Sequence, residues 1–171
     1  MIRAKIEIES LEQYSAPLEG RRGMLRLDFN ENTVGPSPRV IQAIRDLPAE
    51  AYATYPEYAG IAEAYAASIG VSTENVRPFN GVDAAIHAIF DVYGKRGSTF
   101  LTTAPTFGYY GPCALQHGML QDEVLYEDDL SFPLETMKQR LAVKPALCFI
   151  CNPNNPAGTF VDRSNMRQLV D

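Results

Sequence analysis

The sequence predicts an α/β fold with a mostly parallel sheet and helices on both of its faces. Runs rich in β-branched and aromatic residues alternate with amphipathic stretches of helical period, as in βαβ units. One run, PALCFIC at residues 145–151, is apolar throughout, which is typical of a strand buried on both faces of a parallel sheet. The 171 residues are 46% hydrophobic, enough for one core.

The amino-terminal part of the chain contains one expected strand and two expected helices. MLRLDFN, residues 24–30, has the composition of a short strand. The first helix should begin after Ser37, whose hydroxyl can cap it, with Pro38 where no N–H is needed. Pro48 marks its end, and a second helix should cover about residues 60–69.

From about residue 75, expected strands and helices alternate. The expected strands are residues 75–79, 98–105, 119–126 and 145–151. The expected helices are residues 81–94, 107–118 with a break near Pro112, 134–142, and one that opens at Asp162. The sequence stops at Asp171 within this last helix, so we expect it to be a piece of a longer protein.

Composition and charge argue against several classes of function. The net charge is -6 with a pI near 4.9 and no basic patch, so we expect no nucleic-acid partner. No apolar run reaches the length of a membrane span, and the first residues lack the apolar centre of a signal peptide. Among Cys113, Cys148 and Cys151, the one C-x-x-C pair lies in an apolar run, where small buried side chains are a better interpretation than a redox pair. We expect a globular protein of the reducing cytoplasm.

The turn FNGVDAAI, residues 79–86, has features of an anion site. Gly81 lets the backbone turn sharply into a helix, whose first free N–H groups then lie at the positive end of the helix dipole. This arrangement suits a phosphate or a carboxylate. The alternative is an ordinary strand-to-helix turn in which Asp83 favours the helix end, because the stretch lacks the glycines and lysine of a P-loop.

Two further stretches follow strands at one edge of the expected sheet, where open parallel sheets bind ligands. APTFGYY places Phe107 where it could stack on a planar ring or fill the core. CNPNNPAGT, residues 151–159, places three amides on a loop stiffened by prolines. One amide could bond a ring substituent, or the amides could form Asx-turns with their own backbone.

The two histidines offer no evident chemistry. His87 lies among apolar residues on an expected helix, without a cysteine or acidic cluster at ligand spacing, so we expect no metal site. His117 precedes Gly118 and has the position of a helix-end residue. Neither accompanies a G-x-S-x-G elbow, so a hydrolase nucleophile is missing.

Taken in order, LDFNENTVGPSP, TYPEY, FNGVDAAI, APTFGYY and CNPNNPAGTF resemble the fold-type I aminotransferases, which use pyridoxal phosphate. The N-E-N-x-x-G-P-S-P opening is most similar to the histidinol-phosphate aminotransferase group. The likeness spans about residues 27–171 and implies part of the large domain of a pyridoxal-phosphate-dependent transferase. Residues 1–48 would form an amino-terminal arm and first helix, and residues 49–171 the first half of the cofactor-binding large domain.

The resemblance implies roles for matching positions. Asn155 would hydrogen-bond the phenolic oxygen of the cofactor ring, and Phe107 would stack on the face of that ring. Gly81, Val82 and Asp83 would wrap the cofactor phosphate, mostly through backbone N–H groups.

A second set of roles concerns the amino-terminal loops. Tyr55 matches a tyrosine that in the family reaches the cofactor phosphate of the neighbouring subunit, which implies a homodimer with a shared active site. Asn30 and Glu31 lie in the segment that lines the substrate side. One departure affects the phosphate turn. Many relatives have Gly-Ser-Asp-Glu where this chain has Gly-Val-Asp-Ala at residues 81–84, so phosphate binding would depend on backbone.

Three functional residues come later in the family's order: the Schiff-base lysine, the aspartate that pairs with the pyridine nitrogen, and the arginine that takes the substrate carboxylate. The four lysines here, Lys5, Lys95, Lys138 and Lys144, lack a matching context. We therefore expect no catalytic residue within this chain and no activity from the chain alone.

The resemblance implies that the full-length protein transfers an amino group from histidinol phosphate, or a similar small-molecule donor, to 2-oxoglutarate. Alternatives in the superfamily are a threonine-phosphate decarboxylase and an aromatic aminotransferase. An alternative of another class is a catalytically inactive module that binds a phosphate-bearing ligand or has a regulatory role. A nucleotide-binding domain is a weaker candidate, because the phosphate turn lacks its glycines. With an incomplete sheet, we also expect exposed apolar surface.

Overall fold

The computed structural model describes residues 3–9, 11 and 19–170, which form two compact units. The first unit comprises Met1–Glu12 and Phe79–Asp171 and contains the sheet, and the second comprises Gln13–Pro78. Within the described ranges, no helix is both long and apolar enough to cross a membrane.

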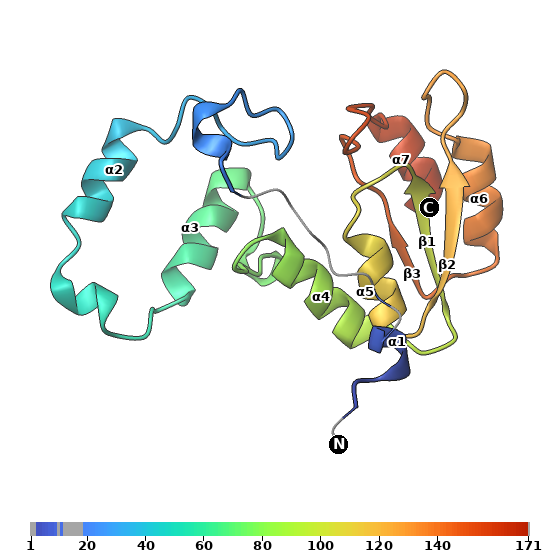
Figure 1. Cartoon of the computed structure of the whole chain (residues 1–171), viewed down its shortest axis with the longest axis horizontal. Helices are drawn as coiled ribbons and strands as arrows, with labels where there is room; N and C mark the ends of the chain where they lie inside the picture. Colours follow the sequence, from blue (N-terminus) through green and yellow to red (C-terminus); the bar gives the residue numbers. More distant parts are fainter. Residues whose placement is uncertain (1–2, 10, 12–18, 171) are drawn as a thin grey trace. The chain divides into compact units, whose positions relative to one another are not determined.

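The sheet of the first unit has three parallel strands in the order β2-β1-β3 (Figure 1). They are β1 (Thr99–Ala104), β2 (Leu120–Leu125) and β3 (Leu147–Phe149). In the central strand β1, Phe100 is in register with Gln121 of β2 and Leu147 of β3. The predicted parallel sheet is confirmed.

Helices cover both faces of this sheet. The helices of the first unit are α1 (Ile6–Glu9), α4 (Val82–Tyr93), α5 (Tyr110–Gln116), α6 (Leu134–Ala142) and α7 (Arg163–Val170). Phe100 and Leu101 are successive residues of β1, so their side chains point to opposite faces. Phe100 packs with Phe90 of α4 and Cys113 of α5, whereas Leu101 packs with Met137 of α6. The predicted α/β fold class is therefore confirmed.

The second unit is helical. It contains α2 (Pro38–Arg45), α3 (Ala59–Ile69) and three short 3-10 turns, η1 (Arg21–Gly23), η2 (Ala49–Tyr52) and η3 (Thr73–Asn75). The Ser37 hydroxyl caps α2 as predicted, accepting a hydrogen bond from the Arg39 N–H at 3.2 Å. Gly70 ends α3 in the left-handed conformation. The core of the unit is small and consists of Ala62, Ala66 and Val76.

Some expected elements are absent or different. Residues 24–30 and 75–79 form no strand, although Val76 has extended dihedral angles. A strand needs a neighbour for its backbone hydrogen bonds, and neither segment pairs with any described residue. Pro112 lies in the first turn of α5, where a helix needs no intrahelical N–H donor, so it causes no break. The strand β3 is half-buried instead of fully buried, because β1 is its only partner in the described chain.

Candidate functional site

The candidate site lies at the edge of the sheet where β1 and β3 end. The two strands are parallel, so their carboxyl ends meet the same edge. The loop after β1 contains Phe107, and the loop after β3 contains the three asparagines. The helix α4 ends shortly before β1 begins and runs in the opposite direction, so its first turn is on the side where the strands finish (Figure 1).

The turn into α4 leaves its backbone open. Gly81 has φ 86° and ψ 163°, a conformation that residues with a side chain rarely adopt. Apart from the glycine itself and its two chain neighbours, no heavy atom of the described residues lies within 4 Å of the position where a Cβ would stand. No side chain caps the helix, and both Val82 and Asp83 are exposed. The N–H groups of the first turn therefore have no intrahelical acceptor and can receive an anion.

The asparagines after β3 have different partners. Asn152 bonds the backbone of Val161 in both directions: its Nδ2 donates to the carbonyl oxygen at 3.0 Å, and its Oδ1 accepts from the N–H at 3.0 Å. This amide stabilises its own loop, as the Asx-turn interpretation expects. By contrast, the half-buried Asn155 amide makes no hydrogen bond to any residue that the structure describes. One amide of the loop thus remains available for a ligand.

Asn154 connects this loop to the loop after β1. Its Nδ2 donates to the carbonyl oxygen of Pro105 at 2.9 Å, and its Oδ1 accepts from the Thr106 hydroxyl at 3.1 Å. Its backbone N–H donates to the Thr159 oxygen at 2.6 Å, and its carbonyl accepts from the Gly158 N–H at 2.7 Å. Nothing in the sequence indicated the side-chain contacts, because their partners lie 48 and 49 residues earlier.

Phe107 is half-buried and packs on the core, as the core interpretation expects, while its stacking on a planar ring stays a prediction. It packs against the core cluster that contains Phe90, and the ring of Tyr110 meets it edge-on at 5.5 Å between centroids. Phe107 also borders a small cavity of about 190 Å³, together with Gly111 and Gln121. The ring is held by the core while part of it stays accessible.

The remaining candidates belong to the second unit. Tyr55 is 99% exposed, and Asn30 has a left-handed φ of 53°, which asparagine tolerates. Glu31 accepts hydrogen bonds from Nε of Arg26 at 2.6 Å and from Arg21 at 3.4 Å. Mainly through the bond from Arg26, the pKa of Glu31 lies below its ordinary value, so this loop presents a paired carboxylate at neutral pH.

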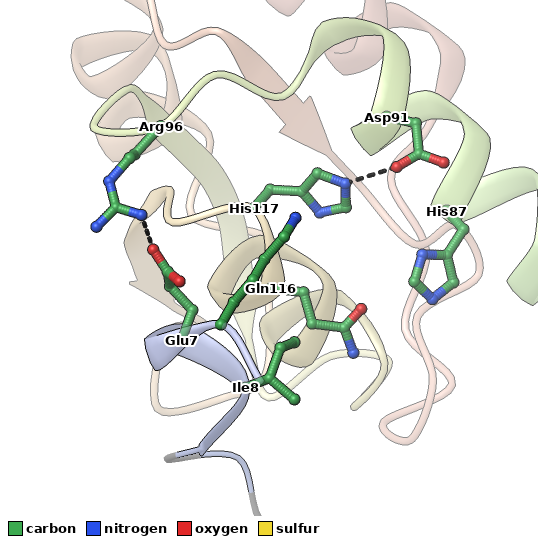
Figure 2. A pocket seen from close by; sticks show the side chains of 8 residues that line it. Glu7, Ile8, His87, Asp91, Arg96, Gln116 and His117 are labelled. Atoms are coloured by element: carbon green, nitrogen blue, oxygen red, sulfur yellow. Dashed lines mark hydrogen bonds and ion pairs between the residues drawn. The ribbon is translucent and has the colours of Figure 1, made fainter. Parts of the chain in front are cut away.

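A larger cavity of about 770 Å³ lies elsewhere in the first unit (Figure 2). Two contacts join side chains of its lining: Arg96 pairs with Glu7, and Nε2 of His117 lies 2.8 Å from Oδ1 of Asp91. None of the candidate residues lines this cavity. It therefore makes no part of the candidate site.

The cysteines are free thiols. Burial raises the pKa of Cys113 and of Cys148 to about 11, so neither is a thiolate at neutral pH. The raised pKa of Cys148 agrees with the structural interpretation of the apolar C-x-x-C run. Across the described residues, no group of three or more His, Cys, Asp or Glu side chains is arranged to hold a metal ion.

Comparison with known protein families shows which family this chain belongs to. The model of the family "Aminotransferase class I and II" matches residues 22–171. This chain belongs to the class I and II aminotransferases. The aminotransferase chain is 30% identical over 172 residues to histidinol-phosphate aminotransferase 1 of Bacillus cereus, covering 99% of this chain and 46% of that protein. It is 29% identical over 154 residues to the histidinol-phosphate aminotransferase of an Anaeromyxobacter strain, covering 89% and 42%.

Solved structures of aminotransferases share the fold. Histidinol-phosphate aminotransferase from Sinorhizobium meliloti, in complex with pyridoxal-5'-phosphate, superposes with a TM-score of 0.84 at 24% identity, over 99% of this chain and 47% of that one. A putative histidinol-phosphate aminotransferase from Erwinia carotovora atroseptica gives 0.73 at 26% identity, over 85% and 43%. The family resemblance predicted from the motifs is thus confirmed. The aminotransferase chain spans less than half the length of these relatives.

Proposed function

We propose that the full-length protein is a pyridoxal-phosphate-dependent aminotransferase that moves an amino group from histidinol phosphate, or a similar donor, to 2-oxoglutarate. The observation that supports it most is the Asn155 amide: it makes no hydrogen bond to any described residue, whereas the side chains of Asn152 and Asn154 are both bonded. The relatives from Bacillus cereus and Anaeromyxobacter described above are named histidinol-phosphate aminotransferases.

The residues of this edge fit the cofactor. The open backbone of Gly81, Val82 and Asp83 suits its phosphate, the accessible part of the Phe107 ring suits a planar pyridine, and the Asn155 amide suits the ring oxygen. Pyridoxal phosphate, when bound, supplies the electron sink for amino-group transfer. The residues of this chain would bind it and set its orientation. The lysine, aspartate and arginine that complete the family's site would lie outside residues 1–171.

We further propose a homodimer with a shared active site. Tyr55 supports it, because its side chain is almost fully exposed and its hydroxyl makes no hydrogen bond within the described ranges. Such a hydroxyl is suited to the cofactor phosphate of a neighbouring subunit. Asn30 and Glu31 would lie on the substrate side. The division into an arm with its first helix, residues 1–48, and a partial large domain, residues 49–171, stays a prediction.

Titration of the full-length protein with pyridoxal phosphate, followed by the absorbance of the bound cofactor, tests the proposal. Asn155→Ala should weaken binding about tenfold, since one oriented hydrogen bond to the ring is lost. Its unfolding midpoint should not change, because the amide makes no hydrogen bond to any residue that the structure describes. Asn152→Ala is the matched control: it should lower stability and leave the spectrum intact. Unchanged affinity in Asn155→Ala contradicts the assigned role of this residue.

Borohydride reduction distinguishes the proposed aminotransferase from a module that only binds a phosphate-bearing ligand. After incubation with pyridoxal phosphate and reduction, the intact mass of the full-length protein should increase by one phosphopyridoxyl group, on a lysine outside residues 1–171. A protein that binds phosphate but gains no such mass would be a binding module, and the proposed function would be wrong.

A further inference from the structure

We propose that Asn154 is a positioning residue that sets the spacing between Phe107 and Asn155. Its side-chain contacts join the loop after β1 to the loop after β3, and these loops contain the two residues proposed to hold the cofactor ring. The expected effect on cofactor binding rests on the proposed function. The contacts of Asn154 with Pro105 and Thr106 do not, because they form without a ligand.

The location of the contacts in the sequence supports this role. The hydroxyl of Thr106 donates to Oδ1 of Asn154 at 3.1 Å. Thr106 immediately precedes Phe107, and Asn154 immediately precedes Asn155. Consecutive Cα atoms are about 3.8 Å apart. A hydrogen bond between Thr106 and Asn154 therefore also restricts the positions of their neighbours Phe107 and Asn155.

Asn154 is itself firmly held. It is 3% exposed, and its backbone N–H and carbonyl both bond within the loop after β3, to Thr159 and Gly158. If the loop after β1 moved, the Asn154 side chain could move with it only by breaking the backbone hydrogen bonds of Asn154 to Thr159 and Gly158. A buried polar group with all these bonds made is costly to displace, because each lost partner leaves a desolvated donor or acceptor.

The contacts require an amide specifically. Oδ1 accepts from the Thr106 hydroxyl while Nδ2 donates to the Pro105 carbonyl at 2.9 Å. An aspartate of the same shape can still accept from Thr106, but it cannot donate to Pro105 and would place a carboxylate beside a carbonyl oxygen. Asn154→Asp thus removes the bond to Pro105 while keeping the volume of the side chain, and Thr106→Val removes the bond from Thr106.

Hydrogen exchange of the cofactor-free, full-length protein tests the connection without any ligand. In Asn154→Asp and in Thr106→Val, amides of residues 104–109 and 152–160 should both exchange at least several-fold faster than in the wild type. Thr106→Ser keeps the hydroxyl donor and should restore protection. The matched control is Asn152→Ala, which removes two side-chain bonds from the same loop but none to Pro105 or Thr106. It should increase exchange only in residues 152–161.

Cofactor titration then tests the consequence. Asn154→Asp should bind pyridoxal phosphate about tenfold more weakly and alter the circular dichroism of the bound ring, while Asn152→Ala retains the wild-type dichroism. Unchanged exchange in residues 104–109 of Asn154→Asp overturns the inference, as does a loosened loop with unchanged affinity and dichroism. If the wild type binds no pyridoxal phosphate, the proposed function fails, and the exchange data alone still decide whether Asn154 holds the two loops together.

Discussion

His117, the residue that follows α5, and Asp91 of α4 are joined by a contact of 2.8 Å between Nε2 and Oδ1. The other ring nitrogen, Nδ1, lies 2.7 Å from the backbone oxygen of Cys113. The contact with Asp91 therefore links α4 to the residue that follows α5, on one face of the sheet (Figure 2).

The first prediction concerns the pH dependence of this link. Mainly through the bond with His117, and also through the charges of His87 and Lys5, the pKa of Asp91 lies below its ordinary value. Arg96 and Glu7 line the same cavity. A lowered folded pKa stabilises the native state at neutral pH, and this contribution is lost as the pH falls through the folded pKa.

Asp91→Asn should therefore unfold at a lower urea concentration than the wild type at pH ~7, and the gap should close as the pH falls below about 3.9, the usual aspartate value. Asp128→Asn is the control, because Asp128 is exposed and makes no side-chain contact with the described residues. A gap of equal size at both pH values would show that the charge of the Asp91 carboxylate does not cause the difference.

A second prediction concerns the core of the first unit. Phe90 is fully buried, and its ring meets those of Phe100 and Phe149 edge-on at 5.1 and 5.2 Å between centroids. Phe90→Ala should lower the free energy of unfolding by about 3–5 kcal/mol, since it removes buried area and leaves a cavity. Phe160→Ala, at a site that is 71% exposed, should cost far less. Urea unfolding of both variants measures the difference.

The cap of α2 offers a third prediction, in the second unit. Ser37→Ala removes the hydroxyl that accepts from Arg39, which should cost about 1 kcal/mol and make the amides of α2 exchange roughly fivefold faster. Ser72 also precedes a helical turn, η3, but its side chain makes no capping bond. Ser72→Ala should therefore leave exchange in η3 unchanged. Equal effects from the two variants would rule out the cap as the cause.

The fourth prediction concerns the backbone at Gly81. Its φ of 86° is unfavourable for any residue with a Cβ, so Gly81→Ala should cost about 1–3 kcal/mol although the space is open. By distorting the first turn of α4, it should also weaken binding of pyridoxal phosphate. Gly60→Ala is the control: Gly60 lies in α3 with equal space but no positive φ, so alanine should be neutral or slightly stabilising. Thermal unfolding and cofactor titration provide both measurements.

Local features of the sequence predicted most of the first unit. The helix that ends at Gly94, the strands β1 and β2, and α6 occur where composition and period placed them. The strand expected at residues 24–30 failed for a physical reason. A segment with strand composition forms a strand only when another strand pairs with it. No described residue pairs with residues 24–30.

The sequence by itself determined what depends on neighbours in the chain. A hydroxyl at Ser37 reaches an N–H two residues later, and a glycine at residue 70 adopts the left-handed angle that ends a helix. Only the tertiary structure decided which amide of the loop after β3 remains available. Asn152 and Asn154 form side-chain hydrogen bonds, whereas Asn155 forms none with the described residues. The partners of Asn154 lie 48 and 49 residues earlier in the chain, in the loop after β1, and the parallel pairing of β1 with β3 brings that loop beside the loop after β3. Contacts at such separation depend on how strands pair and not on local sequence, so they appear only once the sheet has formed.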